Sequence, residues 1–108
     1  MSTANHTVRN RIVFTYSPQD WPVGLITGYD NGRACFVLEH VVSFDSNYLK
    51  RLLKSGLAEA VKQGFGAVIL GIPHEHPRGK PLRVVAEQLG FHEHNSDSFQ
   101  TYFFRLVP

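Results

Sequence analysis

The sequence predicts an α+β domain built on one mixed β-sheet. Apolar residues alternate with a period of two near both ends of the chain, and they recur with a helical period in two segments between. A short buried strand separates the two helical segments, so the predicted order is β-β-β-α-β-α-β-β. With 108 residues, 43% of them hydrophobic, the chain has the size and composition of one globular domain. We expect a flexible tail at residues 1–8 and a single domain over residues 9–108.

The first three strands are predicted as an antiparallel meander. Residues 12–16 alternate in polarity, and a second apolar segment covers residues 23–29. The Asp-Asn-Gly sequence at residues 30–32 predicts a tight hairpin, because Asn and Gly tolerate a positive φ. The return strand over residues 33–43 is nearly continuous in apolar character, as expected of a central strand.

An amphipathic helix is predicted next. From Leu49 to Val61, apolar residues recur at i, i+3, i+4 and i+7, which places them in one stripe along a helix. Ser46 or Asn47 can serve as its N-cap, and Gly64 suits the position after its last turn. The helix is therefore expected to bury one face against the sheet.

A buried strand over residues 67–72 then completes a βαβ unit, which requires a parallel pair of strands with a right-handed crossover. The second helix is predicted to begin with Pro81 at its first position. It ends at Gly90, with Phe91 placed to close a Schellman cap.

The last two strands are predicted at residues 91–94 and 99–107, joined by a polar turn. Tyr102, Phe103 and Phe104 alternate across the second of these strands, so at least one ring faces away from the core. Proteins usually cover such a face or an open sheet edge, and we therefore expect a homo-oligomer.

Composition narrows the function classes. Eleven Lys and Arg against nine Asp and Glu give a formal net charge of +2, which is too small to indicate nucleic-acid binding. The single cysteine excludes a disulfide framework and a cysteine-rich zinc module. No apolar run approaches the ~18 residues of a membrane span, and the first residues do not resemble a signal peptide. We expect a soluble, cytoplasmic protein with no membrane partner.

Two His-Glu-His tripeptides, at residues 74–76 and 92–94, could each present two imidazoles on one face of a strand. Nothing in the sequence brings the two tripeptides together, so surface histidines are the favoured interpretation and no metal site is predicted. His74 or His76 could instead carry a proton near neutral pH.

The element order, the Leu89-Gly90-Phe91 junction before an aromatic last strand, and the Gly64-Phe65 junction resemble the GNAT N-acetyltransferase superfamily over residues 10–107. The resemblance extends from the family's second strand to its end, so we expect the family's first strand and first two helices to be missing. It implies acetyl-CoA as co-substrate. The reaction it implies is acetyl transfer to an amine of a small molecule or a protein.

The resemblance also implies where acetyl-CoA lies, namely between the two parallel strands where they separate. Backbone groups of Val41, Val42 and Ser43 would hold the pantetheine arm and polarise the thioester. The pyrophosphate would rest on the start of the first helix, because free amides and the helix dipole favour an anion there. The residues implied at this helix start are Asn47, Tyr48, Leu49, Lys50 and Arg51.

Glu39 is the candidate catalytic base. It interrupts an apolar strand where several GNAT enzymes carry a glutamate that deprotonates the amine. A solvent-facing glutamate on a half-exposed strand is the alternative interpretation. By strand alternation, His40 is expected on the opposite face from Glu39.

The sequence departs from the family's pattern in its acetyl-CoA motif. The glycines of the phosphate-binding turn are replaced by Asn47 and Leu49, and Asp45 brings a negative charge to that turn. Ala86 stands where family members usually carry a tyrosine acid. A non-catalytic structural or interaction protein that retains the fold is therefore the alternative function. Small GNAT-like virion-associated proteins of tailed phages look similar in their second half, so the cytoplasm of a bacterial host or a phage particle is the expected location.

Overall fold

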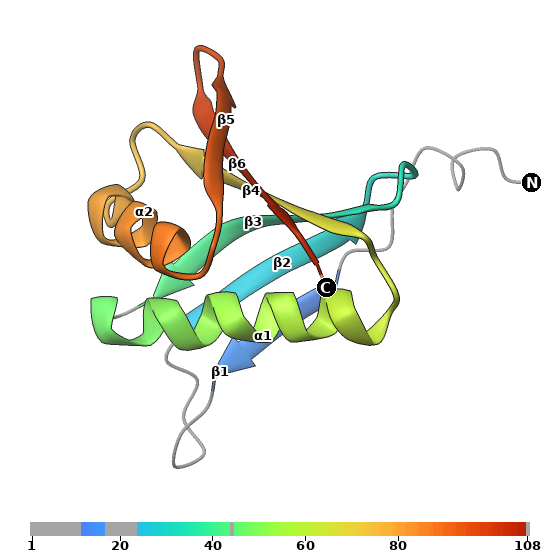
Figure 1. Cartoon of the computed structure of the whole chain (residues 1–108). Coiled ribbons are helices and arrows are strands. Elements are labelled where there is room, and N and C mark those ends of the chain that lie inside the picture. The colour runs from blue at the N-terminus through green and yellow to red at the C-terminus, as the bar shows by residue number, and fades with distance from the viewer. Residues whose placement is uncertain (1–11, 17–23, 44, 108) are drawn as a thin grey trace, which may run out of the picture.

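One six-stranded mixed sheet organises the protein (Figure 1). The structure, a computed structural model, describes residues 12–16, 24–43 and 45–107, so the expected tail at residues 1–8 lies outside the described residues. The strands lie in the order β1-β2-β3-β4-β6-β5. They are β1 (Ile12–Tyr16), β2 (Gly24–Asp30), β3 (Cys35–Ser43), β4 (Ala67–Pro73), β5 (His92–Ser96) and β6 (Gln100–Leu106). The predicted order of strands and helices is confirmed.

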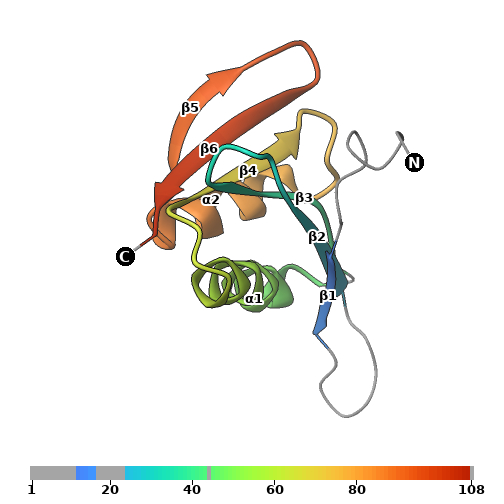
Figure 2. The same ribbon diagram turned by 90° about the vertical axis from the view of Figure 1, so that its right-hand side faces the viewer.

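Two helices, α1 (Leu49–Lys62) and α2 (Gly79–Gln88), lie side by side on one face of the sheet (Figures 1 and 2). Strands β3 and β4 are parallel, while every other pair of neighbouring strands is antiparallel. Strand β5 also runs parallel to β4, with β6 between them, so α2 crosses the sheet in the same sense as α1. Both crossovers therefore place their helix on the same face, and no other described element covers the opposite face.

The core lies between the helices and the sheet. Leu38, Leu53, Leu70 and Phe103 are fully buried there, and the predicted stripe on α1 is confirmed except at its end. Val61 is 53% exposed. Each residue of a helix turns the chain by about 100°, so Val61, twelve residues after Leu49, lies roughly 120° around the helix from it and outside the buried face.

The two helices end in the same Gly-Phe cap. Gly64 and Gly90 have φ values of 81° and 88°, and the N–H of Phe65 and of Phe91 each donates to the carbonyl five residues earlier at 3.0 Å. This is the long hydrogen bond of a Schellman motif, which confirms the predicted Gly90-Phe91 cap. Phe91 is buried, and Phe65 stacks on Phe36 with ring centroids 5.0 Å apart.

The hairpin between β2 and β3 is wider than the predicted two-residue turn. The carboxylate of Asp30 accepts the N–H of Gly32 at 2.7 Å, and the side-chain oxygen of Asn31 accepts the N–H of Cys35 at 3.3 Å. Ala34 takes a positive φ of 64° to close the loop. These side-chain bonds stabilise a four-residue loop, so β3 begins two residues later than predicted.

Both helix starts also differ from the prediction. Asp45 is the cap that leads into α1, because its Oδ1 accepts the Asn47 N–H at 2.9 Å and opens the 3-10 turn η3 (Ser46–Tyr48). The second helix begins at Gly79, two residues before Pro81. A proline is tolerated there because the amides of the first turn need no helical partner.

The last hairpin turns after Ser96, later than predicted. The Oδ1 of Asp97 accepts the N–H of Phe99 at 2.7 Å and of Gln100 at 2.9 Å, and its Oδ2 accepts the Tyr102 hydroxyl at 3.0 Å. These bonds to the charged form, the backbone bond from Gln100 first, hold the pKa of Asp97 below its ordinary value of 3.8.

Candidate functional site

Strands β3 and β4 pair only along part of their length. The parallel ladder runs from Cys35↔Ala67 to Leu38↔Leu70, and both strands then continue without pairing to each other. The gap opens at the carboxyl end of the two strands, where α1 and α2 begin. This is the place at which the sequence resemblance puts the co-substrate.

A β-bulge lies at the start of the gap. Leu25 pairs with Val42 and Thr27 with Glu39, so β3 carries one residue more than β2, and His40 takes a positive φ of 55°. The bulge breaks the strand alternation. The prediction that His40 faces away from Glu39 is therefore wrong: His40 Nε2 lies 3.6 Å from Glu39 Oε1, with the Glu39 side chain 20% and the His40 side chain 66% exposed.

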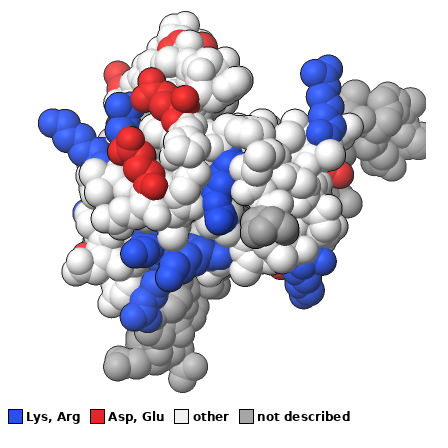
Figure 3. Space-filling view, viewed as in Figure 1, with Lys and Arg blue, Asp and Glu red and all other residues white. Residues whose placement is uncertain are grey.

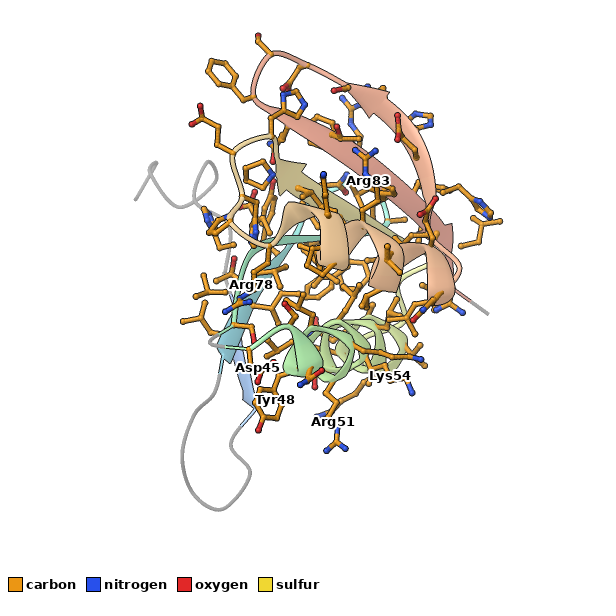
Figure 4. All side chains as sticks on the ribbon, turned by 90° about the vertical axis from the view of Figure 1, so that its left-hand side faces the viewer. Asp45, Tyr48, Arg51, Lys54, Arg78 and Arg83 are labelled. Atoms are coloured by element: carbon orange, nitrogen blue, oxygen red, sulfur yellow. The ribbon has the colours of Figure 1, made fainter. Side chains whose placement is uncertain are left out.

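The loop between β4 and α2, residues 74–78, crosses the gap (Figure 4). The His76 imidazole hydrogen-bonds through Nε2 to the carbonyl oxygen of Val41. Arg78 donates from Nε to the carbonyl of Ser43 at 2.9 Å and from its guanidinium to the Ser46 hydroxyl at 3.0 Å. The loop thus connects to the end of β3, which does not pair with the end of β4.

The partners of His76 fix its tautomer. Its Nε2 faces a carbonyl and must carry the hydrogen, while its Nδ1 accepts the N–H of Arg78 at 2.9 Å. His74 points elsewhere, with its Nε2 3.0 Å from the Ser96 hydroxyl. The first His-Glu-His tripeptide therefore does not present both rings to one ion, and the described residues hold no group of three or more potential metal ligands.

Val41, Val42 and Ser43, the predicted pantetheine contacts, lie at this gap. Val41 and Ser43 are buried, Val42 is 49% exposed, and the carbonyls of Val41 and Ser43 are the two that the 74–78 loop occupies. A hollow of about 330 Å³ remains between these residues and the loop, with His40, Pro73 and Glu75 also in its wall.

At the predicted phosphate site, the helix start is occupied by its own chain. The N–H of Asn47 donates to the Asp45 carboxylate, that of Tyr48 to the Asp45 carbonyl at 3.1 Å, and that of Leu49 to the Ser46 carbonyl. The carboxylate of Asp45 is thus the anion that satisfies this helix start. The sequence identified Asp45 as a negative charge but not as the cap.

Basic side chains gather beside this turn. Lys50, Arg51 and Lys54 are exposed on the first turns of α1. Figure 3 shows Lys and Arg side chains gathered on this part of the surface, and Figure 4 shows Arg51 and Lys54 on the outer side of the helix. Ala86, at the position where the resemblance implies a tyrosine acid, is fully buried in the core and offers no proton.

The sequence alone does not identify Arg78, because nothing in a Pro-Arg-Gly loop indicates that its side chain reaches a strand 35 residues earlier.

Known proteins share this architecture. The chain matches the solved structure of nourseothricin acetyltransferase with a TM-score of 0.75 and 13% identity, covering 91% of this chain and 66% of that one. It matches the PaiA N-acetyltransferase from Thermoplasma acidophilum, solved with coenzyme A, with a TM-score of 0.73, 12% identity, and 95% and 64% coverage. The match to aminoglycoside 6'-acetyltransferase type Ii has a TM-score of 0.68 and 22% identity, and it covers 91% of this chain and 70% of that one. No protein-family model and no curated protein matches the sequence.

These likenesses confirm the predicted fold class, a GNAT-like mixed sheet with two helices. The chain spans about two thirds of the length of the first two of these acetyltransferases. Neither helix of the described chain combines the length and the apolar character that crossing a membrane requires.

Proposed function

We propose that this domain transfers an acetyl group from acetyl-CoA to an amine. The observation that carries the proposal is the position of Glu39, a largely buried carboxylate where β3 and β4 separate within an acetyltransferase fold. A neighbour of the same fold holds coenzyme A in its solved structure, which supports acetyl-CoA as the co-substrate.

Glu39 and the end of β3 have roles in this reaction. Glu39, directly or through a water molecule, takes a proton from the ammonium group, and the freed amine nitrogen attacks the thioester carbon. The new C–N bond forms as the C–S bond breaks, and amides near Val41–Ser43 polarise the carbonyl. After the attack the nitrogen is positively charged, and it loses its second proton to solvent to become the neutral amide. The thiolate leaves without a protein acid, because Ala86 supplies none, and takes up one proton from solvent.

Binding of the co-substrate requires a change in the 74–78 loop. An extended pantetheine arm along β3 would compete with His76 and Arg78 for the carbonyls of Val41 and Ser43. Lys50 and Arg51 are exposed, so each contributes little to holding phosphate. We therefore expect coenzyme A to bind weakly, in the high micromolar range or worse.

The same contacts favour a second candidate, a non-catalytic interaction protein that retains the fold. Its strand gap is bridged by His76 and Arg78, its helix start is capped by Asp45, and the acid position is a buried alanine. A domain of this kind needs no co-substrate, and its loop contacts would serve stability alone.

Calorimetric titration with coenzyme A, together with an assay of thiol release from acetyl-CoA, separates the two candidates. Glu39→Gln should abolish turnover while the melting temperature is retained, and Glu87→Gln, on the exposed side of α2, should leave turnover unchanged. Turnover that survives Glu39→Gln would remove this residue from the mechanism. Complete absence of coenzyme A binding would establish the non-catalytic candidate.

A further inference from the structure

The sheet face opposite the helices presents a row of side chains from four neighbouring strands. Tyr29 pairs with Val37, Val37 with Ile69, and Ile69 with Phe104, so these four residues lie side by side across β2, β3, β4 and β6. They form part of the wall of a hollow of about 470 Å³. That volume lies in the range of sites for small organic molecules, roughly 300–1,000 Å³.

The part of this wall that the described residues form is rich in aromatic rings. His94 and Tyr102 add two rings to those of Tyr29 and Phe104, and the His94 ring centroid lies 6.1 Å from that of Phe104. The remaining polar groups are amides from Asn31 and Asn95. Among the described residues that line the hollow, none is Asp, Glu, Lys or Arg.

Tyr102 is held in a fixed orientation at the edge of the hollow. Its hydroxyl donates to Asp97 at 3.0 Å and accepts from the Gln100 amide at 2.9 Å. Burial, and then the bond and charge of Asp97, raise the pKa of Tyr102, while the bond from Gln100 opposes the rise. The phenol therefore stays neutral and its ring offers a rigid contact surface.

The hollow lies next to the candidate base. Glu39 follows Val37 by two residues on β3, before the bulge, so both side chains lie on this same face about 7 Å apart along the strand. A molecule seated on the row could extend a chain of two or three carbons to the carboxylate.

We propose that the hollow binds the acceptor, and that the acceptor is a monoamine with an aromatic or bulky apolar body, not a polyamine or a basic peptide. This inference rests on the proposed function and adds its substrate class. An apolar body is matched by the aromatic row, and its single ammonium group by the carboxylate of Glu39. A polycation would need several carboxylates. The other carboxylate at the edge of the hollow, that of Asp97, already accepts hydrogen bonds from Phe99, Gln100 and Tyr102, so the described wall would leave further positive charges without a partner.

Phenethylamine and spermidine are suitable probes, titrated into the full chain without acetyl-CoA and followed by amide chemical shifts. Phenethylamine should bind at least tenfold more tightly and shift the amides of β3, β4 and β6 around the row. Phe104→Ala should weaken its binding at least tenfold. Leu106→Ala, on the same strand but 71% exposed and outside the hollow, should change binding less than twofold.

Asn95→Asp provides a second variant that does not disturb the core, because Asn95 is exposed at the rim. The added charge should narrow the preference for phenethylamine over spermidine. Equal or tighter binding of spermidine to the unmodified chain would overturn the proposal, and so would the absence of shifts with either amine. A second copy of the chain that covers this face, seen as a concentration-dependent dimer that excludes phenethylamine, would overturn it as well.

Failure of the proposed substrate class and failure of the proposed acetyl transfer give different results. If coenzyme A binds and acetyl-CoA is consumed but phenethylamine does not bind, the substrate class is wrong and the activity stands. If phenethylamine binds in the hollow and coenzyme A does not bind at all, the acetyl-transfer function fails, and the hollow remains a binding site for apolar amines.

Discussion

Removing the His76 side chain should strengthen the binding of coenzyme A while it weakens the fold. His76 occupies the Val41 carbonyl, which an arm along β3 would use, so the wild-type protein must break that bond before it binds. In His76→Ala the Val41 carbonyl is already available. Coenzyme A then binds without first breaking the His76–Val41 hydrogen bond, and its apparent affinity rises by the free energy of that step.

The size of the effect follows from the burial of that carbonyl. Val41 is only 2% exposed, and an unsatisfied buried acceptor costs about 1–3 kcal/mol. Since 1.4 kcal/mol corresponds to a factor of ten, this range equals about 5- to 150-fold in affinity. We expect the lower end, about five- to tenfold, because the adjacent hollow admits water to the freed group.

His74→Ala is the matched control. His74 lies in the same loop but bonds to Ser96 and Thr101, so its removal also loosens the loop without freeing β3. Calorimetric titration of coenzyme A and thermal unfolding, measured on both variants, give the required pair of readouts. Both variants should melt at a lower temperature, and only His76→Ala should bind more tightly. Weaker binding by His76→Ala, or the same gain in both variants, would refute the reasoning.

Three further predictions concern the fold. Leu53→Ala should cost about 2–5 kcal/mol in chemical denaturation, since the side chain is fully buried, whereas Lys54→Ala should stay within about 0.5 kcal/mol; equal losses would mean that the buried side of α1 is misassigned. Gly28→Ala should cost about 1–3 kcal/mol by overpacking, because a Cβ there would lie 2.5 Å from the buried Phe36 ring, and an unchanged melting temperature would contradict this contact. The pKa of Asp97 is lowered in the folded state, so the ionised carboxylate stabilises the fold at pH values above 3.8, the ordinary pKa. This stabilisation is lost as the pH falls from 3.8 through the lowered pKa, and the higher melting temperature of the wild type relative to Asp97→Asn should disappear over the same pH range. A higher wild-type melting temperature that persists below this pH range would exclude stabilisation by the Asp97 carboxylate.

The sequence was sufficient for the elements whose cause is periodic or local. The α1 stripe around Leu53, the parallel βαβ unit and the Gly90-Phe91 cap follow from spacing or from a single positive φ, and all three are present. The hairpin width was not predictable from the Asn-Gly pair alone. There Asp30 and Asn31 bond to backbone amides farther along the chain and stabilise a longer loop.

The candidate site depends on contacts between distant residues, and there the sequence was insufficient. Glu39 was identified because a carboxylate interrupts an apolar strand, but its approach to His40 depends on a bulge that the amino-acid pattern does not indicate. The bonds of His76 and Arg78 to β3 join residues 35 positions apart, and their geometry is set by the path of the loop.

The bridge made by the 74–78 loop also has a consequence for the kinetics of folding. The β3–β4 ladder begins where Cys35 pairs with Ala67, so its formation already closes the long chain loop that contains α1. Once that chain loop is closed, the bonds of His76 to Val41 and of Arg78 to Ser43 close almost no additional loop, so they add little entropic cost and can form after the rate-limiting step. Contacts that are absent from the transition state act on unfolding alone. Substitutions in this loop should therefore accelerate unfolding and leave the refolding rate nearly constant, which gives the protein a means of adjusting the lifetime of its native state without slowing its formation.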